Sequence, residues 1–436
     1  MSGCCERTAA PRALACIHRA VGSFHRRRRN VIRPDQRDTC RRARHDRAAL
    51  QDKGEPINGV FERLLLLGGG HAQLAVLADL ARQPLGGWSV TLVTPYRRQI
   101  YSGMLPGWVA GHYPIEACAI ALDRLAGHAG VHLQTGLGSA IDLPGRRLHG
   151  ADGSVLPFDA LSIDTGPVAD LAALPGAEAH ALPVRPIERF VDEWPRLAER
   201  MAAARAGFRL QILGGGAAGV ELALAIRQRA TAEGWRLAID LVGAGDAPLP
   251  GTPRAAQAMA ARLLAERSIV WHGGRRAEAL TAGRLHLNAG PTLPFDACIV
   301  ATGAAAPDWP AASGLAVDGS GFIAVGATLQ SRSHPNVFAA GDVAALPEPR
   351  PKSGVYAVRA GPVLAANLRA FCTGQPLQRW QPQRRALYLV STGDRQALAL
   401  WGPLAWRGPW VWRWKDRIDR GFMQRFGSDA AGVDAG

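Results

Sequence analysis

The chain carries the same strand, glycine turn and helix pattern twice. Residues 63–67, an arginine followed by four leucines, are typical of a short buried parallel strand, and the glycine turn 68–73 follows directly. The pattern returns with the predicted strand 209–213 and the turn 214–219. In such turns glycine allows a tight bend, and backbone amides at the start of the following helix can approach a pyrophosphate. One turn alone is a weak signal, but two constrain the chain to a pair of similar α/β modules.

A second repeat supports this interpretation. The sequence Leu-Pro-Phe-Asp-Ala occurs at residues 156–160 and again at residues 293–297. Each copy leads into an apolar strand that ends in Thr-Gly, at residues 165–166 and 302–303. Two glycine turns, each followed by the same strand, indicate duplicated modules. We therefore predict an α/β protein with two Rossmann-like dinucleotide-binding domains that hold two nucleotides.

Charge and cysteine content exclude several classes of protein. About half of the net charge of +15 comes from residues 1–60, where 14 Lys and Arg stand against 6 Asp and Glu. That stretch lacks helical or strand periodicity, so we predict a disordered extension and no nucleic-acid partner, and whether it is translated stays open. The cysteines show no CxxC spacing, which argues against a metal site and a disulfide scaffold. We expect a cytoplasmic protein, with or without a peripheral contact to the inner face of the cell membrane.

The two modules, together with the strand 336–342 that ends in Gly-Asp, resemble the pyridine nucleotide-disulfide oxidoreductase superfamily over residues 62 to about 380. The segments 90–94 and 101–107 look like those of the type II NADH dehydrogenase and sulfide:quinone oxidoreductase branch. The first glycine turn, residues 101–107 and the tail 391–420 resemble a bacterial subgroup associated with selenide, water dikinase. The resemblance implies that the first module binds FAD and that the inserted second module binds NAD(P)H.

The resemblance also implies a domain order. We predict an Arg-rich extension at residues 1–60 and the first part of the FAD domain at residues 61–175. The NAD(P)H domain is expected at residues 176–305, and the second part of the FAD domain at residues 306–378. Residues 379–436 form a C-terminal helical and aromatic tail.

Candidate cofactor contacts follow from the turns, the strand ends and the family pattern. They share a place at a glycine turn, at the end of a strand or at the start of a helix. The candidates are Gly68, Gly70, His71, Ala72, Thr94, Ser102, Gly103, Thr165, Gly166, Gly214, Gly216, Gly219, Thr302, Gly303, Gly341, Asp342, Gly354 and Val355. Asp342 is expected to contact the ribityl chain, and the helix from Gly354 is expected to place its positive end near the flavin.

Glu221 is the candidate catalytic residue, because the resemblance places a glutamate here close to the nicotinamide. A glutamate in a first helical turn also stabilises the helix, so both interpretations stay open. Gln73 replaces the third glycine of the first turn. In the FAD module Thr94 stands where an acid would bind the ribose, so adenosine recognition must use other groups. The matching region 240–245 of the second module has neither a clear terminal acid for NADH nor an arginine for NADPH, so the coenzyme preference stays open.

The CxxxxC pair of disulfide reductases is missing, so we predict electron transfer to a quinone or another small acceptor without a redox-active disulfide. Val355 and Arg359 stand where relatives that reduce quinones carry glutamines, and Arg359 could instead favour an anionic acceptor. The alternative is a redox sensor that binds FAD and NADH with little turnover.

The tail concentrates aromatic residues. Five of the 12 tryptophans lie between positions 401 and 414, and a stripe with four-residue spacing is predicted to form one helical face. The stripe consists of Trp410, Trp414, Ile418, Phe422 and Phe426. With arginines on other faces, a helix over residues 401–426 suits the surface of an anionic membrane. Packing on the flavin domain, or on a second subunit in a homodimer, is the other interpretation.

Overall fold

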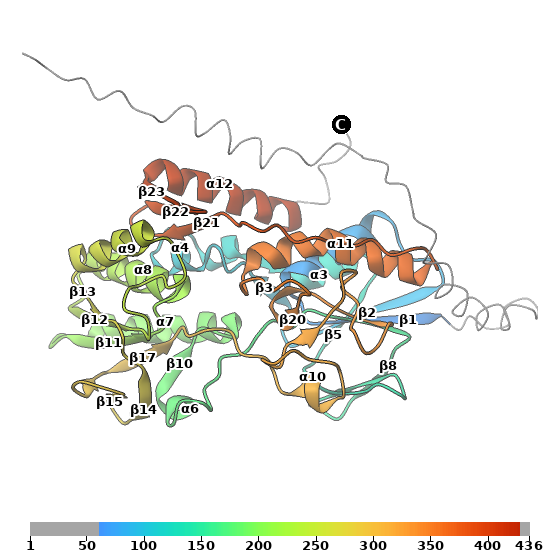
Figure 1. Cartoon of the computed structure of the whole chain (residues 1–436), viewed down its shortest axis with the longest axis horizontal. Coiled ribbons are helices and arrows are strands. Elements are labelled where there is room, and N and C mark those ends of the chain that lie inside the picture. The colour runs from blue at the N-terminus through green and yellow to red at the C-terminus, as the bar shows by residue number, and fades with distance from the viewer. Residues whose placement is uncertain (1–60, 428–436) are drawn as a thin grey trace, which may run out of the picture. The chain divides into compact units, whose positions relative to one another are not determined.

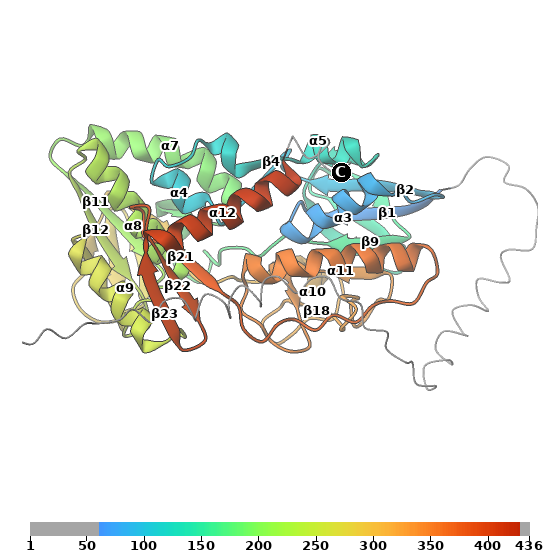
Figure 2. The ribbon, with the colours of Figure 1, turned by 90° about the horizontal axis from the view of Figure 1, so that it is seen from above.

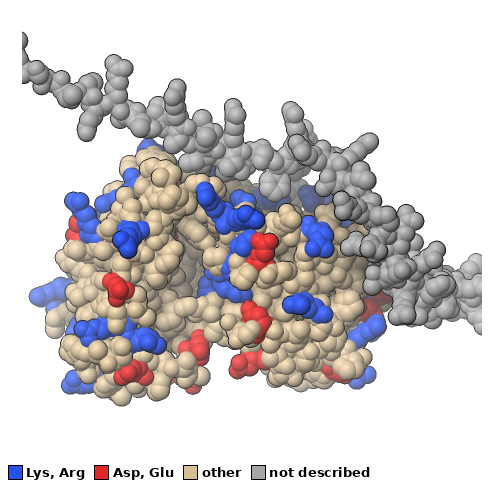
Figure 3. All heavy atoms as spheres, in the orientation of Figure 1, with Lys and Arg blue, Asp and Glu red and all other residues tan. Residues whose placement is uncertain are grey.

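Two five-stranded parallel sheets, each flanked by helices, organise the chain (Figures 1 and 2). The computed structural model describes residues 61–427, so the extension predicted at residues 1–60 lies outside the described residues. All described residues belong to one unit. In the face shown in Figure 3, basic side chains lie over both halves of this unit, and several gather where the halves meet.

The first sheet has β1 (Glu62–Leu67) at its centre. It pairs on one side with β9 (Ala160–Ile163) and on the other with β2 (Trp88–Thr94). The outer strands are β19 (Val337–Ala339) and β5 (His132–Thr135). The leucines at positions 64 to 67 of β1 are at most 3% exposed, as expected for a strand covered on both faces.

Two helices, α3 (His71–Arg82) and α11 (Gly354–Cys372), pack side by side over this sheet (Figures 1 and 2). Their close approach depends on Gly361. A Cβ at this position would lie 2.8 Å from the Cβ of Ala75 and 3.0 Å from the carbonyl oxygen of Ala72. The helix that follows the first glycine turn is therefore held against the helix that follows Asp342.

The second sheet repeats the arrangement of the first. Its central strand β11 (Phe208–Leu213) lies between β17 (Ala297–Val300) and β12 (Leu237–Val242). The outer strands are β10 (Ala181–Pro183) and β13 (Ile269–His272). Helices of this half are α7 (Ile187–Ala203), α8 (Ala217–Glu233) and α9 (Arg254–Glu266).

The two copies of Leu-Pro-Phe-Asp-Ala make the same contact. In the first sheet, the carboxylate of Asp159 accepts a hydrogen bond of 2.9 Å from the backbone N–H of Arg63. In the second, Asp296 accepts a bond of 2.8 Å from the backbone N–H of Arg209. In each sheet the strand after the repeat therefore lies next to the strand before the glycine turn. This duplication confirms the predicted α/β class with two Rossmann-type sheets.

The remaining elements are shorter. Each half contains a three-stranded antiparallel sheet, and further short elements connect the large ones. They are β6 (Gly138–Asp142), β7 (Arg147–Gly150), β8 (Val155–Pro157), β14 (Ala277–Thr281), β15 (Arg284–Leu287), β16 (Leu293–Pro294), β3 (Arg98–Ile100), β4 (Ala119–Ala121), β18 (Ile323–Ala324), β20 (Ala344–Ala345), α4 (Leu105–Val109), α5 (Leu122–His128), α6 (Ala177–His180), α10 (Trp309–Ala312), η2 (Ile115–Cys118) and η3 (Gly341–Val343).

The C-terminal part contains a small sheet as well as the predicted helix. Strands β21 (Tyr388–Ser391), β22 (Ala397–Trp401) and β23 (Leu404–Gly408) pair in antiparallel fashion. Helix α12 (Pro409–Phe426) follows and extends from this sheet towards α5 (Figure 2). No helix within residues 61–427 is both long and apolar enough to span a bilayer.

The aromatic stripe of α12 is not one face, which corrects the prediction. Phe426 is 4% exposed, whereas Trp410 and Ile418 are 38% and 42% exposed. Residues four apart differ by about 40° around a helix, so five of them wrap through about 160°. The buried positions of α12 instead include Lys415 and Asp419.

A test of the packing between α3 and α11 is Gly361→Ala. The added methyl group meets backbone and Cβ atoms of α3, so we expect the free energy of unfolding to fall by about 1–3 kcal/mol. Gly421→Ala is the matched control, because a Cβ at this helical glycine meets no atom within 4 Å. That variant should gain about 0.5–1 kcal/mol. Urea unfolding of both proteins measures the difference, and equal effects would contradict the close helix contact.

Candidate functional site

Both glycine turns bring a helix start against the end of a neighbouring strand. Gly68 and Gly214 have φ angles of +89° and +121°, which L side chains rarely adopt. A Cβ at Gly68 would lie 2.4 Å from the carbonyl oxygen of Asp164, and a Cβ at Gly214 would lie 2.3 Å from that of Ala301. The two turns therefore have the same backbone geometry, and only glycine fits at their first position.

The predicted contacts of the first module gather at the carboxyl ends of β1 and β9. Gly70 donates a backbone hydrogen bond of 3.1 Å to the carbonyl of Asp164, and a Cβ at Gly341 would lie 2.3 Å from Oδ1 of the same residue. Thr165 and Gly166 continue the chain from Asp164. Thr94 ends β2, where its hydroxyl accepts a bond of 3.4 Å from Tyr96 N–H.

His71 opens α3 and lies in an aromatic and amide environment. Its Nδ1 is 3.0 Å from Nε2 of Gln99, and its ring lies 5.6 Å from Tyr101 and 5.8 Å from Phe422. Burial lowers the pKa of His71 to about 4, so the imidazole is neutral at pH 7. The sequence predicted His71 but not Gln99, Tyr101 or Phe422.

Asp342 lies in η3 with cations on either side. Arg185, from the loop after β10, approaches its carboxylate at 3.8 Å. Burial raises the pKa of Asp342, and the charges of Arg185 and Lys352 oppose that shift. The start of α11 is adjacent, since Ser353 N–H hydrogen-bonds to Asp342 and a Cβ at Gly354 would lie 3.7 Å from Ser102 Oγ.

These surroundings fit FAD. Several buried polar atoms near the first turn and Asp342 have no hydrogen-bond partner among the described residues. They are His71 Nε2, Gln99 Oε1 and Arg185 Nη1. Unpaired buried polar atoms are costly, and a group with many donors and acceptors, such as an isoalloxazine with its ribityl chain, would satisfy them.

The contacts predicted for the second module lie at the ends of β11 and β17. Gly214, Gly216 and Gly219 form the turn into α8, and a Cβ at Gly214 would lie 3.0 Å from the backbone nitrogen of Thr302. Gly303 follows. A Cβ at Gly216 meets no atom within 4 Å, so backbone amides there are open to a ligand.

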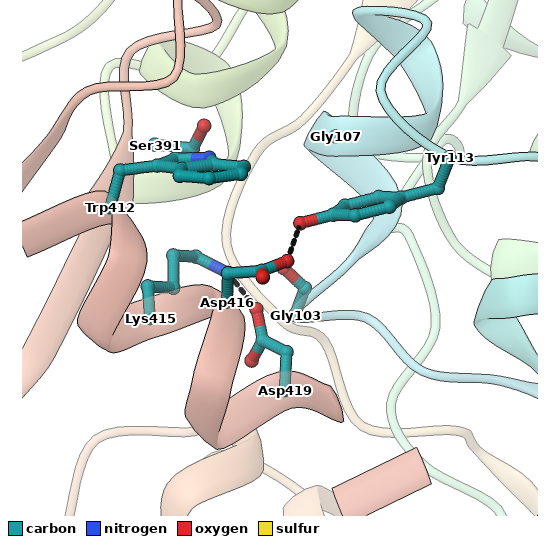
Figure 4. A pocket seen from close by; sticks show the side chains of 8 residues that line it. All are labelled: Gly103, Gly107, Tyr113, Ser391, Trp412, Lys415, Asp416 and Asp419. Carbon is teal, nitrogen blue, oxygen red and sulfur yellow. Dashed lines mark hydrogen bonds and ion pairs between the residues drawn. The ribbon is translucent and has the colours of Figure 1, made fainter. Parts of the chain in front are cut away.

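A small polar pocket lies between α12, β21 and the segment around α4 (Figure 4). Its lining comes from the turn before α4, from α4, from the loop after it, from β21 and from α12, and includes Gly103, Gly107, Tyr113, Ser391, Trp412, Lys415, Asp416 and Asp419. The ammonium of Lys415 donates to the Gly103 carbonyl at 2.5 Å and to Asp419 at 2.6 Å. Tyr113 donates to Asp416 at 2.5 Å.

Glu221 lies next to this pocket. Its Oε1 accepts a hydrogen bond of 2.6 Å from the backbone N–H of Ser391, which lines the pocket. Burial raises the pKa of Glu221 to about 7, with opposition from Lys415. The structure thus brings Glu221 and Gly103, which were predicted separately, to one place through α12. The sequence pattern missed Lys415 and Asp419, because charged side chains on a helix usually face solvent.

Among the described residues, no cluster of His, Cys, Asp and Glu could hold a metal ion. The cysteines at positions 118, 298 and 372 are buried and form no disulfide bond with one another. Val355 follows Gly354 in the first turn of α11, while Arg359 lies exposed one turn later.

Comparisons with known proteins agree with this geometry. A family model described as pyridine nucleotide-disulphide oxidoreductase matches residues 62–361. The chain is 26% identical over 317 residues to a probable ferredoxin reductase, CtmF, of Castellaniella defragrans, covering 69% of this chain and 72% of that protein. It is 27% identical over 350 residues to the demethylphylloquinone reductase NdbB of Synechocystis, covering 76% of this chain and 85% of that protein.

Two solved structures share the fold at lower identity. Sulfide:quinone oxidoreductase from Aquifex aeolicus aligns with a TM-score of 0.70 and 17% identity, over 84% of this chain and 91% of that chain. NDH2 from Plasmodium falciparum aligns with a TM-score of 0.68 and 13% identity, over 84% and 98% of the two chains. Fold and family are those of oxidoreductases that bind FAD and NAD(P)H, as the sequence predicted.

The shifted pKa of Glu221 gives a test by pH. A carboxyl whose pKa is raised from 4.5 to about 7 on folding destabilises the folded protein increasingly as pH rises through that window. Glu221→Gln keeps the acceptor for Ser391 N–H and removes the ionisation. We expect the free energy of unfolding of the variant, relative to that of the wild type, to be about 2–3 kcal/mol higher at pH 8 than at pH 4.5. Thermal unfolding at both pH values measures this, with the exposed Glu193→Gln as control. A pH-independent difference would contradict the shift.

Proposed function

Because the chain belongs to the pyridine nucleotide-disulphide oxidoreductase family, we propose that it takes hydride from NAD(P)H onto FAD and passes the electrons to a quinone or another small acceptor. The observation that carries this proposal is the pair of equivalent glycine turns at Gly68 and Gly214, whose first position only glycine fits. The small polar pocket under α12, next to Glu221, supplies candidate groups for the proton of the acceptor. No redox-active disulfide takes part. Burial raises the pKa of the Cys118 and Cys298 thiols to about 12, so both are protonated and poor nucleophiles at neutral pH.

Sequence motifs support a finer placement within the family. The segments 90–94 and 101–107 favour the branch like type II NADH dehydrogenases. The first glycine turn, residues 101–107 and the tail 391–420 favour the subgroup associated with selenide, water dikinase. The domain boundaries given above and the cofactor contacts at the two turns are part of the same proposal. Asp342 and the start of α11 would hold the ribityl chain and the pyrimidine edge of FAD.

The reaction sets requirements for the pocket. Quinone, NAD(P)H and one proton give quinol and NAD(P)⁺, so an acceptor oxygen must receive a proton from the protein. FAD, when bound, supplies the two-electron transfer between the two substrates. Lys415 is placed to hydrogen-bond to the acceptor oxygen, since its bonds to the Gly103 carbonyl and to Asp419 use two of its three N–H donors. Asp419 and Glu221 can return a proton to it.

A lysine variant tests this role. We expect Lys415→Met to leave the anaerobic reduction of the flavin by NADH or NADPH within about twofold of the wild type. Reoxidation by a soluble ubiquinone analogue should slow by at least about 10-fold, the effect of losing a positioned proton donor. Stopped-flow absorbance of the flavin measures both steps. The control is Arg196→Met on α7, whose ion pair with Glu193 is exposed.

Three outcomes would count against parts of the proposal. Flavin that is reduced once by NADH and is not reoxidised by any quinone would favour the alternative of a redox sensor. Reoxidation by a ferredoxin and not by quinones would replace the acceptor class. Equal reoxidation rates for Lys415→Met and Arg196→Met would remove Lys415 from the mechanism.

The exposed side of α12 supports a peripheral contact with an anionic membrane at the cytoplasmic face. Trp410 and Ile418 are exposed there, and Leu404 on β23 is 50% exposed. Arg413 and Arg417 are also exposed on α12. Aromatic and aliphatic side chains flanked by arginines favour the headgroup region of an anionic bilayer.

Vesicle sedimentation tests this contact. We expect the protein to sediment with vesicles that contain 30% anionic lipid, about the proportion needed for a basic surface, and much less with neutral vesicles. Trp410→Ser combined with Ile418→Ser should abolish most of the binding. Val270→Ser is the control, since Val270 is also exposed, at 53%, but lies on β13. A change of oligomeric state in the double variant, with binding to vesicles unaltered, would show instead that this face forms a homodimer.

A further inference from the structure

The two glycine turns share a backbone but differ in one side chain. Asp164 and Ala301 occupy matched positions, because each carbonyl lies against the first glycine of its turn and each residue precedes Thr-Gly. In the first module this position carries a carboxylate, and in the second it carries a methyl group. The difference lies at the place where each helix presents its first backbone amides.

The carboxylate of Asp164 occupies the start of α3. Its Oδ2 accepts hydrogen bonds of 2.8 Å from Ala72 N–H and 3.1 Å from Gln73 N–H. The residue is 2% exposed, and a Cβ at Gly70 would lie 2.3 Å from its carboxyl group. A Cβ at Gly216, the matching glycine of the second turn, would meet no atom within 4 Å. In the first module an acidic side chain therefore lies at the start of the helix, whereas in the second module no side chain fills the matching place.

No cation pairs with this carboxylate among the described residues. The imidazole of His71, on α3, is neutral at pH 7. The carboxyl of Asp342, on η3, raises the pKa of Asp164 further. Arg185 forms an ion pair with Asp342, and the charge of Lys352 also acts on Asp342, not on Asp164. Within residues 61–427, the hydrogen bonds to the carboxylate of Asp164 come from the backbone N–H groups of Ala72 and Gln73 at the start of α3.

A second anion at this turn would lie beside the first. Helix N-termini attract phosphate through their free N–H groups, and two negative groups in one buried site cannot both stay ionised at low cost. A neutral Asp164 removes the repulsion. Its Oδ1, which neither backbone bond engages, can carry the proton.

We propose that Asp164 is a positioning residue that couples FAD binding to proton uptake, so that the first module holds FAD tightly only while this carboxyl is protonated. This inference depends on FAD binding but not on the acceptor or on turnover. Burial already raises the pKa of Asp164 to about 7 in the protein without ligand. A bound pyrophosphate raises that pKa further, so the affinity for FAD is constant below about pH 7 and falls as pH rises above it.

The test titrates flavin-free protein with FAD between pH 6 and pH 9 and follows the quenching of flavin fluorescence. We expect the dissociation constant of the wild type to rise by up to about 10-fold per pH unit above pH 7. Calorimetry in two buffers of different ionisation enthalpy should show uptake of up to one proton at pH 8. Asp164→Asn keeps an acceptor for the α3 amides and should make FAD binding independent of pH, without proton uptake.

The second module offers the reciprocal variant. Ala301→Asp places a carboxyl at the open position beside Gly216, and should weaken binding of NAD(P)H at pH 8 more than at pH 6. Asp296→Asn, on the approach to the same strand, is the control and should not create such a dependence. A wild type whose affinity for FAD does not vary with pH, or an Asp164→Asn variant with the wild-type slope, would overturn the inference. Failure to bind FAD at any pH would instead contradict the proposed function.

Discussion

Close backbone contact between a glycine turn and the next strand of the sheet is the constraint on which the two modules depend. At Gly68 and Gly214 the carbonyl of the facing strand lies where a side chain would begin. This contact fixes the distance between the central strand, the first helix and the strand that ends in Thr-Gly. The sheet order and the aspartates that follow Leu-Pro-Phe then repeat in both halves, because the same local geometry is used twice.

The two glycine turns have similar backbones but different side chains at the end of the facing strand. The turn into α8 is open beside Gly216, as a phosphate site requires, whereas the turn into α3 already contains the carboxylate of Asp164. One residue therefore gives the first module a dependence on protonation that the second lacks. Two copies of one fold can differ in this way because the side chain at the strand end changes the electrostatic field at the start of the helix, while the backbone stays the same.

The C-terminal helix adds the polar groups that the two modules do not supply. Lys415 and Asp419 form a buried ion pair, which costs desolvation unless further hydrogen bonds compensate, and the carbonyl of Gly103 provides one. The pair places an ammonium beside Glu221 and in the pocket at the junction. A purely structural helix would be served as well by apolar residues at these positions, so the charged pair favours a role in the chemistry of the acceptor.

The sequence by itself determined the duplicated turns, the α/β class and the family, because glycine positions, apolar runs and the Leu-Pro-Phe-Asp-Ala repeat are local patterns that one backbone geometry requires. It also contained the difference between Asp164 and Ala301, although its meaning depends on which amides the side chain reaches. Only the tertiary structure decided that Lys415 is buried, that Phe422 packs on Tyr101 and that Glu221 lies beside α12. These contacts join residues up to 321 positions apart, as between Tyr101 and Phe422, and helical spacing cannot say which side of a helix will meet the rest of the protein.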